Sequence, residues 1–158
     1  MSIETIAQGL ADTSLATTLS DSSWLFGTVE SIHVLALTLV LGSITLVDLR
    51  LIGIGPSRGS AEQVLHRLLP FTLGGFVLAA ITGSVLIFAN PIGYSKNFFF
   101  AAKFSLLALA GINALVFHIF FQRRLVDGAS LAPRISGGVS LALWVSIIAT
   151  ARWIGYTI

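Results

Sequence analysis

Several ionisable residues of this 158-residue sequence lie inside long apolar stretches, where an unpaired charge is expensive. Glu30 and His33 are one helical turn apart in the first such stretch, so they lie on nearly the same face of a helix. A carboxylate beside an imidazole can orient the ring, help to bind a metal ion or pass a proton. The same pair also suits a histidine that only makes a packing hydrogen bond.

A second histidine, His118, ends a helical stripe that begins at Lys103 in a later apolar stretch. Ala110 and Ala114 lie on this stripe and leave room for a flat cofactor or for a close helix. Asn113 is near the same face and offers a polar contact. These residues therefore suit either a bound ring or a packed neighbouring helix.

Two acidic residues and two basic residues have the same separation along their helices. Glu30 and Asp48 are 18 residues apart, which is about five helical turns, so they share one stripe. Arg134 and Arg152 have the same separation in the last apolar stretch. If the two helices are antiparallel, we expect Glu30 to pair with Arg152 and Asp48 to pair with Arg134. Lys103 competes for Glu30, which would leave Arg152 available for an anionic group.

The elements that position these residues are transmembrane helices. The chain is 55% hydrophobic and only 10% charged, whereas soluble domains carry about 25% charged residues. A span needs roughly 20 apolar residues, and the sequence predicts four spans, at about residues 24–51, 68–90, 98–122 and 134–156. We therefore expect an all-α integral membrane four-helix bundle that forms a single domain over residues 1–158.

Local signals refine this expectation. The run from Asp21 to Ser23 is typical of a helix N-cap, and the second span is expected to follow Pro70. Small residues at helical spacing on the second span predict close approach of a neighbouring helix, namely Gly75, Ala79 and Gly83. Apolar residues at helical spacing near the N-terminus predict a short amphipathic segment before the bundle, namely Ile3, Ile6, Ala7 and Leu10.

The charges between the spans predict the orientation, because Lys and Arg are retained on the cytoplasmic side. Six arginines fall between the first and second or the third and fourth spans: Arg50, Arg58, Arg67, Arg123, Arg124 and Arg134. Both termini are therefore expected outside, which is the periplasm for a bacterial inner membrane. The aromatic residues expected at that outer interface are Trp24, Tyr94, Trp153 and Tyr156. No basic surface suggests nucleic acid, and with no cysteine there is no disulfide or thiolate ligand.

Haem b is a natural cofactor to consider, because neutral imidazole binds its iron between the helices of a bundle. His33 and His118 are expected on the order of 15 Å apart along the membrane normal, so one iron cannot bind both. His118 could instead pair with His66 if the second helix begins early. A quinone site needs only a histidine or carboxylate, an aromatic wall and a proton route. Such a site could form at the outer interface from Glu30, His33, Trp24, Lys103 and Arg152.

The chain resembles a widespread family of small, largely uncharacterised bacterial inner-membrane proteins. The resemblance covers nearly the whole membrane region and is carried by three motifs: E-x-x-H at Glu30 to His33, D-L-R-L at Asp48 to Leu51, and N-A-x-x-x-H at Asn113 to His118. It implies a four-span pattern but no settled activity. More distantly, the chain looks like haem-binding membrane oxidases and copper-resistance membrane proteins. His66 is not part of the pattern.

The leading hypothesis is a redox-associated membrane protein that binds haem b or quinone through His33 and His118. Glu30 would orient His33 or carry protons, Asn113 would add a polar contact, and Lys103, Arg134 and Arg152 would hold propionates or acidic partners. The first alternative is a cofactor-free accessory subunit of a larger respiratory or transport complex, or a homo-oligomer in the bilayer. The second alternative is a small transporter.

Overall fold

The computed structural model describes residues 3–54, 61–121 and 131–158, which are helical almost throughout and contain no strand. Four helices are long and apolar enough to cross a membrane. They are α3 (Ser23–Ile52), α4 (Ala61–Ile87), α6 (Phe98–Val116), which continues into the π-helical turn η1 (Phe117–Phe121), and α7 (Leu131–Thr157). The expected all-α four-helix membrane protein is confirmed.

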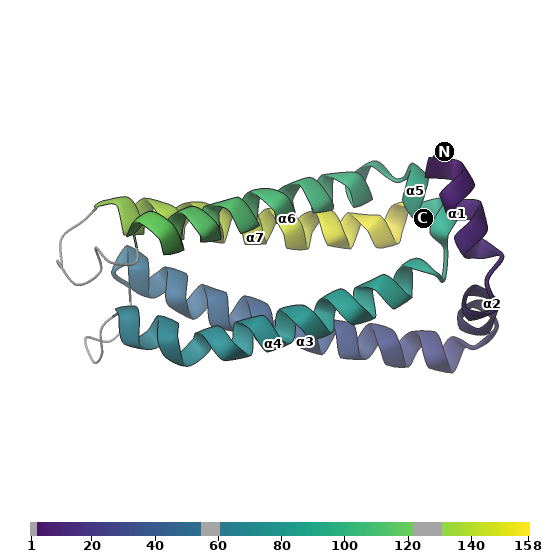
Figure 1. Ribbon diagram of the computed structural model, residues 1–158, viewed down its shortest axis with the longest axis horizontal. Coiled ribbons are helices and arrows are strands. Elements are labelled where there is room, and N and C mark those ends of the chain that lie inside the picture. Colours follow the sequence, from purple (N-terminus) through teal and green to yellow (C-terminus); the bar gives the residue numbers. More distant parts are fainter. Residues whose placement is uncertain (1–2, 55–60, 122–130) are drawn as a thin grey trace.

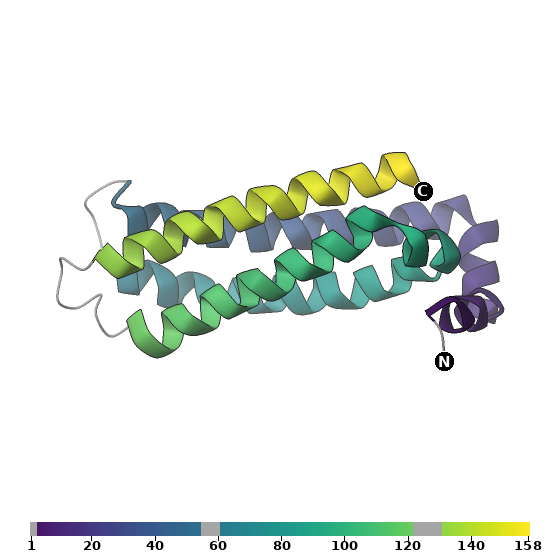
Figure 2. The same ribbon diagram turned by 90° about the horizontal axis from the view of Figure 1, so that it is seen from above.

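The four long helices run along one axis with alternating direction (Figures 1 and 2). Both chain ends lie at the same end of the bundle, which we call the terminal end, and the other is the opposite end (Figure 1). α3 packs against both α4 and α7, and α6 packs against α7. In the described part of the chain, α4 and α6 do not pack closely against each other. The bundle is therefore two helical hairpins joined along a seam between α3 and α7.

The seam between α3 and α4 is built on the small residues of α4. A Cβ atom added at Gly75 would lie 3.0 Å from Cγ2 of Val40 and 3.2 Å from the carbonyl oxygen of Ala36. Ala79 is buried on the same ridge, and a Cβ at Gly83 would lie 3.0 Å from the His33 ring. The predicted close approach along this ridge is confirmed.

The helix ends follow ordinary capping chemistry, with one difference from expectation. The Ser22 side chain accepts a hydrogen bond from the backbone N–H of Leu25 and caps α3, within the predicted capping run. Asn97 caps α6 in the same way and also donates to Thr157 Oγ1 at 2.7 Å, which ties α6 to the end of α7. Pro70, by contrast, lies inside α4, which begins at Ala61 with Glu62 in its first turn.

Short helices cover the terminal end. They are α1 (Ile3–Ala11), α2 (Ser14–Asp21) and α5 (Pro91–Lys96). α1 packs against α5 (Figure 1), and Glu4 forms an ion pair of 3.7 Å with Lys96. Of the predicted amphipathic residues, which all lie in α1, Ala7 is 4% exposed, whereas Ile3 is 70% and Ile6 47% exposed. The expected N-terminal segment is therefore a helix that is only partly packed on the bundle.

Candidate ligand-binding cavity

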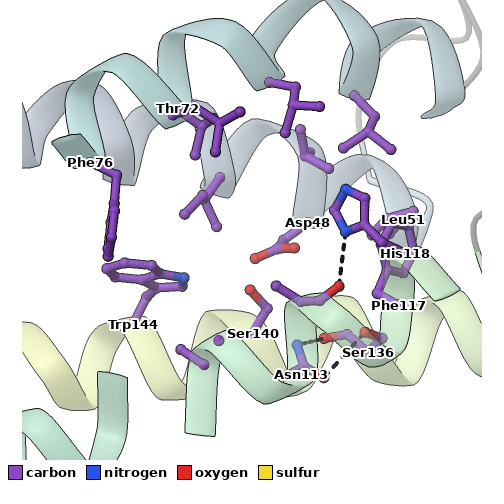
Figure 3. Close-up of a pocket in the computed structure, with 18 of the residues that line it drawn as sticks. Asp48, Leu51, Thr72, Phe76, Asn113, Phe117, His118, Ser136, Ser140 and Trp144 are labelled. Carbon is purple, nitrogen blue, oxygen red and sulfur yellow. Dashed lines mark hydrogen bonds between the residues drawn. The ribbon is translucent and has the colours of Figure 1, made fainter. Parts of the chain in front are cut away.

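A cavity of about 350 Å³ lies between the four long helices, in the half of the bundle near the opposite end. This volume is at the lower end of the range of small-molecule sites, about 300–1,000 Å³. Most of the lining is apolar or aromatic (Figure 3). The polar and aromatic side chains that line it are Asp48, Thr72, Phe76, Asn113, Phe117, His118, Ser136, Ser140 and Trp144.

Asp48 of α3 provides the most unusual group of this cavity. The residue is only 5% exposed, and its Oδ2 atom is buried without a hydrogen-bond partner. Ser140 of α7 is turned toward this carboxyl group (Figure 3). Ser140 hydrogen-bonds the carboxyl group, but no ion pair with it is found among the described residues. A buried carboxylate without a counter-ion is far more expensive than a neutral acid, so Asp48 is expected to carry its proton when the cavity holds no cation.

Other polar groups of the cavity wall are already paired. Asn113 Nδ2 donates to the carbonyl oxygen of Ser136 at 3.2 Å, and Ser136 Oγ donates back to Asn113 Oδ1 at 3.2 Å. Thr72 Oγ1 donates to Ser43 Oγ at 2.7 Å. These bonds join α6 to α7 and α4 to α3. The sequence predicted a polar contact from Asn113, and the structure places it at this helix–helix bond.

His118 lines the cavity, and one of its ring nitrogens is already hydrogen-bonded. Its Nδ1 lies 2.8 Å from the carbonyl oxygen of Ala114. A carbonyl only accepts, so Nδ1 carries the proton and Nε2 keeps its lone pair. The residue belongs to η1, and π-helical turns of this kind are frequent at functional sites. His118 can therefore accept a hydrogen bond from a molecule in the cavity.

Two aromatic side chains close the end of the cavity farthest from His118. Phe76 of α4 and Trp144 of α7 lie together there, and the indole nitrogen of Trp144 is on the side facing Asp48 (Figure 3). Trp144 and Ser140 were missed as site residues. Their signal is a stripe at every fourth residue of the last span, Ser136, Ser140 and Trp144, with a tryptophan in mid-span instead of at the interface.

His33, the other predicted ligand, lies outside this cavity. Its Nδ1 is 2.9 Å from Thr82 Oγ1, and the Thr82 hydroxyl lies 2.7 Å from the carbonyl oxygen of Leu78, to which it donates. His33 therefore donates from Nδ1 to Thr82 and keeps its Nε2 lone pair. The carboxylate of Glu30, which was expected to orient this ring, is replaced in that role by the threonine of α4.

The two histidines are farther apart than the sequence predicted. The bond between Asn113 and Ser136, together with the contact of Gly137 with Leu51, places the His118 end of α6 level with the last turn of α3. The 18 residues from His33 to Leu51 correspond to about 27 Å of helix. The expectation that one iron cannot bind both rings agrees with this geometry.

The two predicted ion pairs are absent among the residues that the structure describes. Arg152 instead donates to the hydroxyl group of Tyr156 at 2.9 Å and stacks over its ring. The Arg134 guanidinium lies beside the end of α3, at 4.0 Å from a Cβ added at Gly53. Both predicted ion pairs are wrong for one reason, which is the register of α3 against α7.

That register was predicted from charge matching and differs from the packing. Pairing Asp48 with Arg134 requires these two residues to lie at the same level of the bundle. In the structure a Cβ at Gly137 would lie 3.1 Å from both the Asp48 carbonyl oxygen and Leu51 Cβ. Residue 48 therefore faces a position three to five residues beyond Arg134, which is about 5–8 Å along the helix. Close backbone approach at Gly137 decides the register, and Asp48 meets Ser140 instead of an arginine.

The described ones among the remaining predicted residues do not line this cavity. Lys103 and His33 are close enough to interact electrostatically, as are Glu30 and Tyr94, all in the half near the terminal end. His66 lies on exposed α4 surface, 3.9 Å from Glu62. Arg58, Arg123 and Arg124 lie outside the described residues. Within the described part of the chain, no three His, Cys, Asp or Glu side chains are grouped as metal ligands would be.

Comparison with known families agrees with the resemblance seen in the motifs. The profile of DUF6644, described as a family of unknown function, matches residues 11–157. The chain belongs to this family. Comparisons with curated proteins and with solved structures find no match. For this DUF6644 member, a functional conclusion must therefore come from the cavity itself.

Proposed function

We propose that this DUF6644 member binds the ring of a lipid-soluble quinone or quinol in the cavity lined by Asp48, His118 and Trp144, as a redox-associated protein of the bacterial inner membrane. The observation that carries the proposal is the buried Oδ2 atom of Asp48, which has no hydrogen-bond partner in a mostly apolar cavity. Native proteins rarely leave such a group unpaired. A bound molecule that supplies the missing hydrogen bond explains it.

The hydrogen-bonding groups at the cavity suit a quinol ring. Neutral Asp48 can donate to a ring oxygen, and the indole N–H of Trp144 can donate from the same side (Figure 3). His118 offers the opposite function, because its Nε2 accepts and can bind a phenolic O–H. Flat aromatic walls at Phe76 and Phe117 suit a planar ring.

Haem b is the weaker form of the redox hypothesis. Among the cavity residues that the structure describes, His118 is the single histidine, so a second axial ligand from this chain is missing. The described residues of the lining also include no Lys or Arg side chain to hold the propionates. The residues present do not fit a haem, whereas a quinol ring needs neither group.

Ring binding is tested by the fluorescence of Trp144. The chain has three tryptophans, and Trp24→Phe with Trp153→Phe leaves Trp144 as the sole reporter. Purified protein in detergent is titrated with a short-chain benzoquinone and separately with its quinol, and quenching of Trp144 gives the Kd. We expect saturable quenching with a stoichiometry of one. Non-saturating, collisional quenching, or a Soret band with a reduced-minus-oxidised alpha band in the purified protein, would overturn the quinone assignment.

Two substitutions of Asp48 separate its roles. Asp48→Asn keeps an N–H donor and should retain most of the binding, whereas Asp48→Leu removes the hydrogen bond. A hydrogen bond is worth about 0.5–1.5 kcal/mol, so Asp48→Leu should raise Kd about 2- to 12-fold. His118→Ala should weaken the quinol more than the quinone. His33→Ala is the matched control, because His33 lies outside the cavity. Loss of all ring binding in Asp48→Asn would contradict the role of Asp48 as a hydrogen-bond donor to the ring.

A further inference from the structure

The cavity is closed on one side and more open on the other. Its floor is made by α3 and α7, where Val47, Asp48, Leu51 and Ser136 are each less than 9% exposed. Several residues that line it from α4 and α6 are far more open, although Leu65 and Ala110 are buried. Leu73 is 57% exposed and Phe76 is 49% exposed, and Gly111 and Ala114 are exposed on the facing helix.

This exposed side coincides with the unpacked side of the bundle. α4 and α6 do not pack closely in the described chain, whereas α3 and α7 do. Because the surface of these helices lies in lipid, an opening between them leads into the bilayer and not into water. The cavity therefore has Asp48 and Ser140 at its floor and its mouth in hydrocarbon.

From this arrangement we infer that the ligand is an amphiphile dissolved in the bilayer, which enters between α4 and α6 and leaves its long apolar tail in that mouth. The inference rests on the proposed ring site and adds the class of the ligand and its route. The polar ring reaches Asp48 at the floor, and the tail lies across Leu73 and Gly111 into the lipid. A water-soluble ligand would need a path through the ends of the bundle instead.

Gly111 provides a selective test, because it belongs to the mouth and has free space beside it. A Cβ added at Gly111 meets nothing within 4 Å, so a larger side chain can grow into the mouth without displacing the backbone. Gly74 of α4 is the matched control. It is exposed in mid-span, it does not line the cavity, and a Cβ there also meets nothing within 4 Å.

The experiment compares one benzoquinone ring without a tail and the same ring with a ten-carbon chain, in the Trp144 reporter background. Gly111→Phe should raise the Kd of the tailed ring about tenfold, a change that corresponds to about 1.4 kcal/mol. The tailless ring, which fits below the mouth, should change less than threefold. Gly74→Phe should change neither Kd.

The outcomes separate this inference from the proposed function. If the wild type binds neither ring, the proposed ring site is wrong. If it binds both and Gly111→Phe alters them equally, or alters neither, the ring site stands and the tail does not occupy this mouth. If Gly111→Phe instead changes the mass of the protein–detergent complex by one protomer, a second copy of the chain covers the opening and the inference is overturned.

Discussion

Replacing Asp48 by leucine should make the unliganded protein more stable, although it weakens ligand binding. Asp48 is 5% exposed and its Oδ2 has no partner, and an unsatisfied buried polar group costs about 1–3 kcal/mol. Leucine has the same branching and number of side-chain heavy atoms and meets the apolar residues Val47, Leu51 and Leu65 of the cavity lining. The substitution removes the penalty, so the free energy of unfolding should rise by about 1–3 kcal/mol.

The measurement is thermal loss of helical circular dichroism in detergent. For a chain of this size, 1 kcal/mol shifts Tm by roughly 2–4 °C, so Asp48→Leu should melt about 2–12 °C above the wild type. Asp48→Ala removes the same carboxyl but enlarges the cavity, so it should gain less. A saturating quinone should then raise the Tm of the wild type more than that of Asp48→Leu.

The opposite sign would refute the reasoning. If Asp48→Leu melts below the wild type, the carboxyl group stabilises the empty fold and its unpaired oxygen is no signature of a ligand. If the substitution is stabilising but quinone raises the Tm of both proteins equally, Asp48 does not contact the ligand and the ring binds elsewhere. A residue that lowers stability while it strengthens binding is the pattern expected of a functional site.

Two further predictions concern packing and ionisation. Gly75→Ala should destabilise the protein by about 1–3 kcal/mol, because its Cβ would lie 3.0 Å from Val40 and 3.2 Å from a backbone oxygen of α3. Gly74→Ala is the control, because the added Cβ meets free space, and it should not lower the Tm by a comparable amount. Equal effects of the two substitutions would contradict the described seam. Burial, and secondarily the charge of Glu30, raise the pKa of Tyr94 above its usual value. A pH titration followed by absorbance at 295 nm should therefore show a phenol that ionises at unusually high pH and is removed by Tyr94→Phe. Persistence of this ionisation in the variant would contradict the assignment.

Much of the fold follows from hydropathy and capping residues alone. Apolar stretches long enough to span a bilayer, with Ser22 before the first, predict α3 and its start. The start of α4 was predicted wrongly at Pro70. A proline is typical of a helix start, but it is also tolerated within a membrane helix, as it is here. The small ridge at Gly75 and Gly83 predicted close packing but gave no register. Such information lies in backbone contacts that a single sequence does not contain.

The candidate site was predicted only in part. His118, Asn113 and Asp48 were all selected, because ionisable and polar residues in lipid need partners. Their partners were assigned by matching charges, but the packing of Gly137 against α3 shifts α7 along α3 and places Ser140, six residues beyond Arg134, beside Asp48. Trp144 was not predicted because the prediction considered ionisable residues in the spans, and tryptophan carries no charge. The cavity itself depends on how two helix pairs meet, which no motif encodes.

The joining of α3 and α7 along a single seam has a consequence for biogenesis. The hairpin of α3 and α4 and the hairpin of α6 and α7 each contain their own internal packing, and α5 connects them at the terminal end. Each hairpin can therefore enter the membrane as a unit, and docking at Gly137 completes the bundle afterwards. Two separately translated halves, divided within residues 91–96, should reassemble into the intact protein when produced together in one cell.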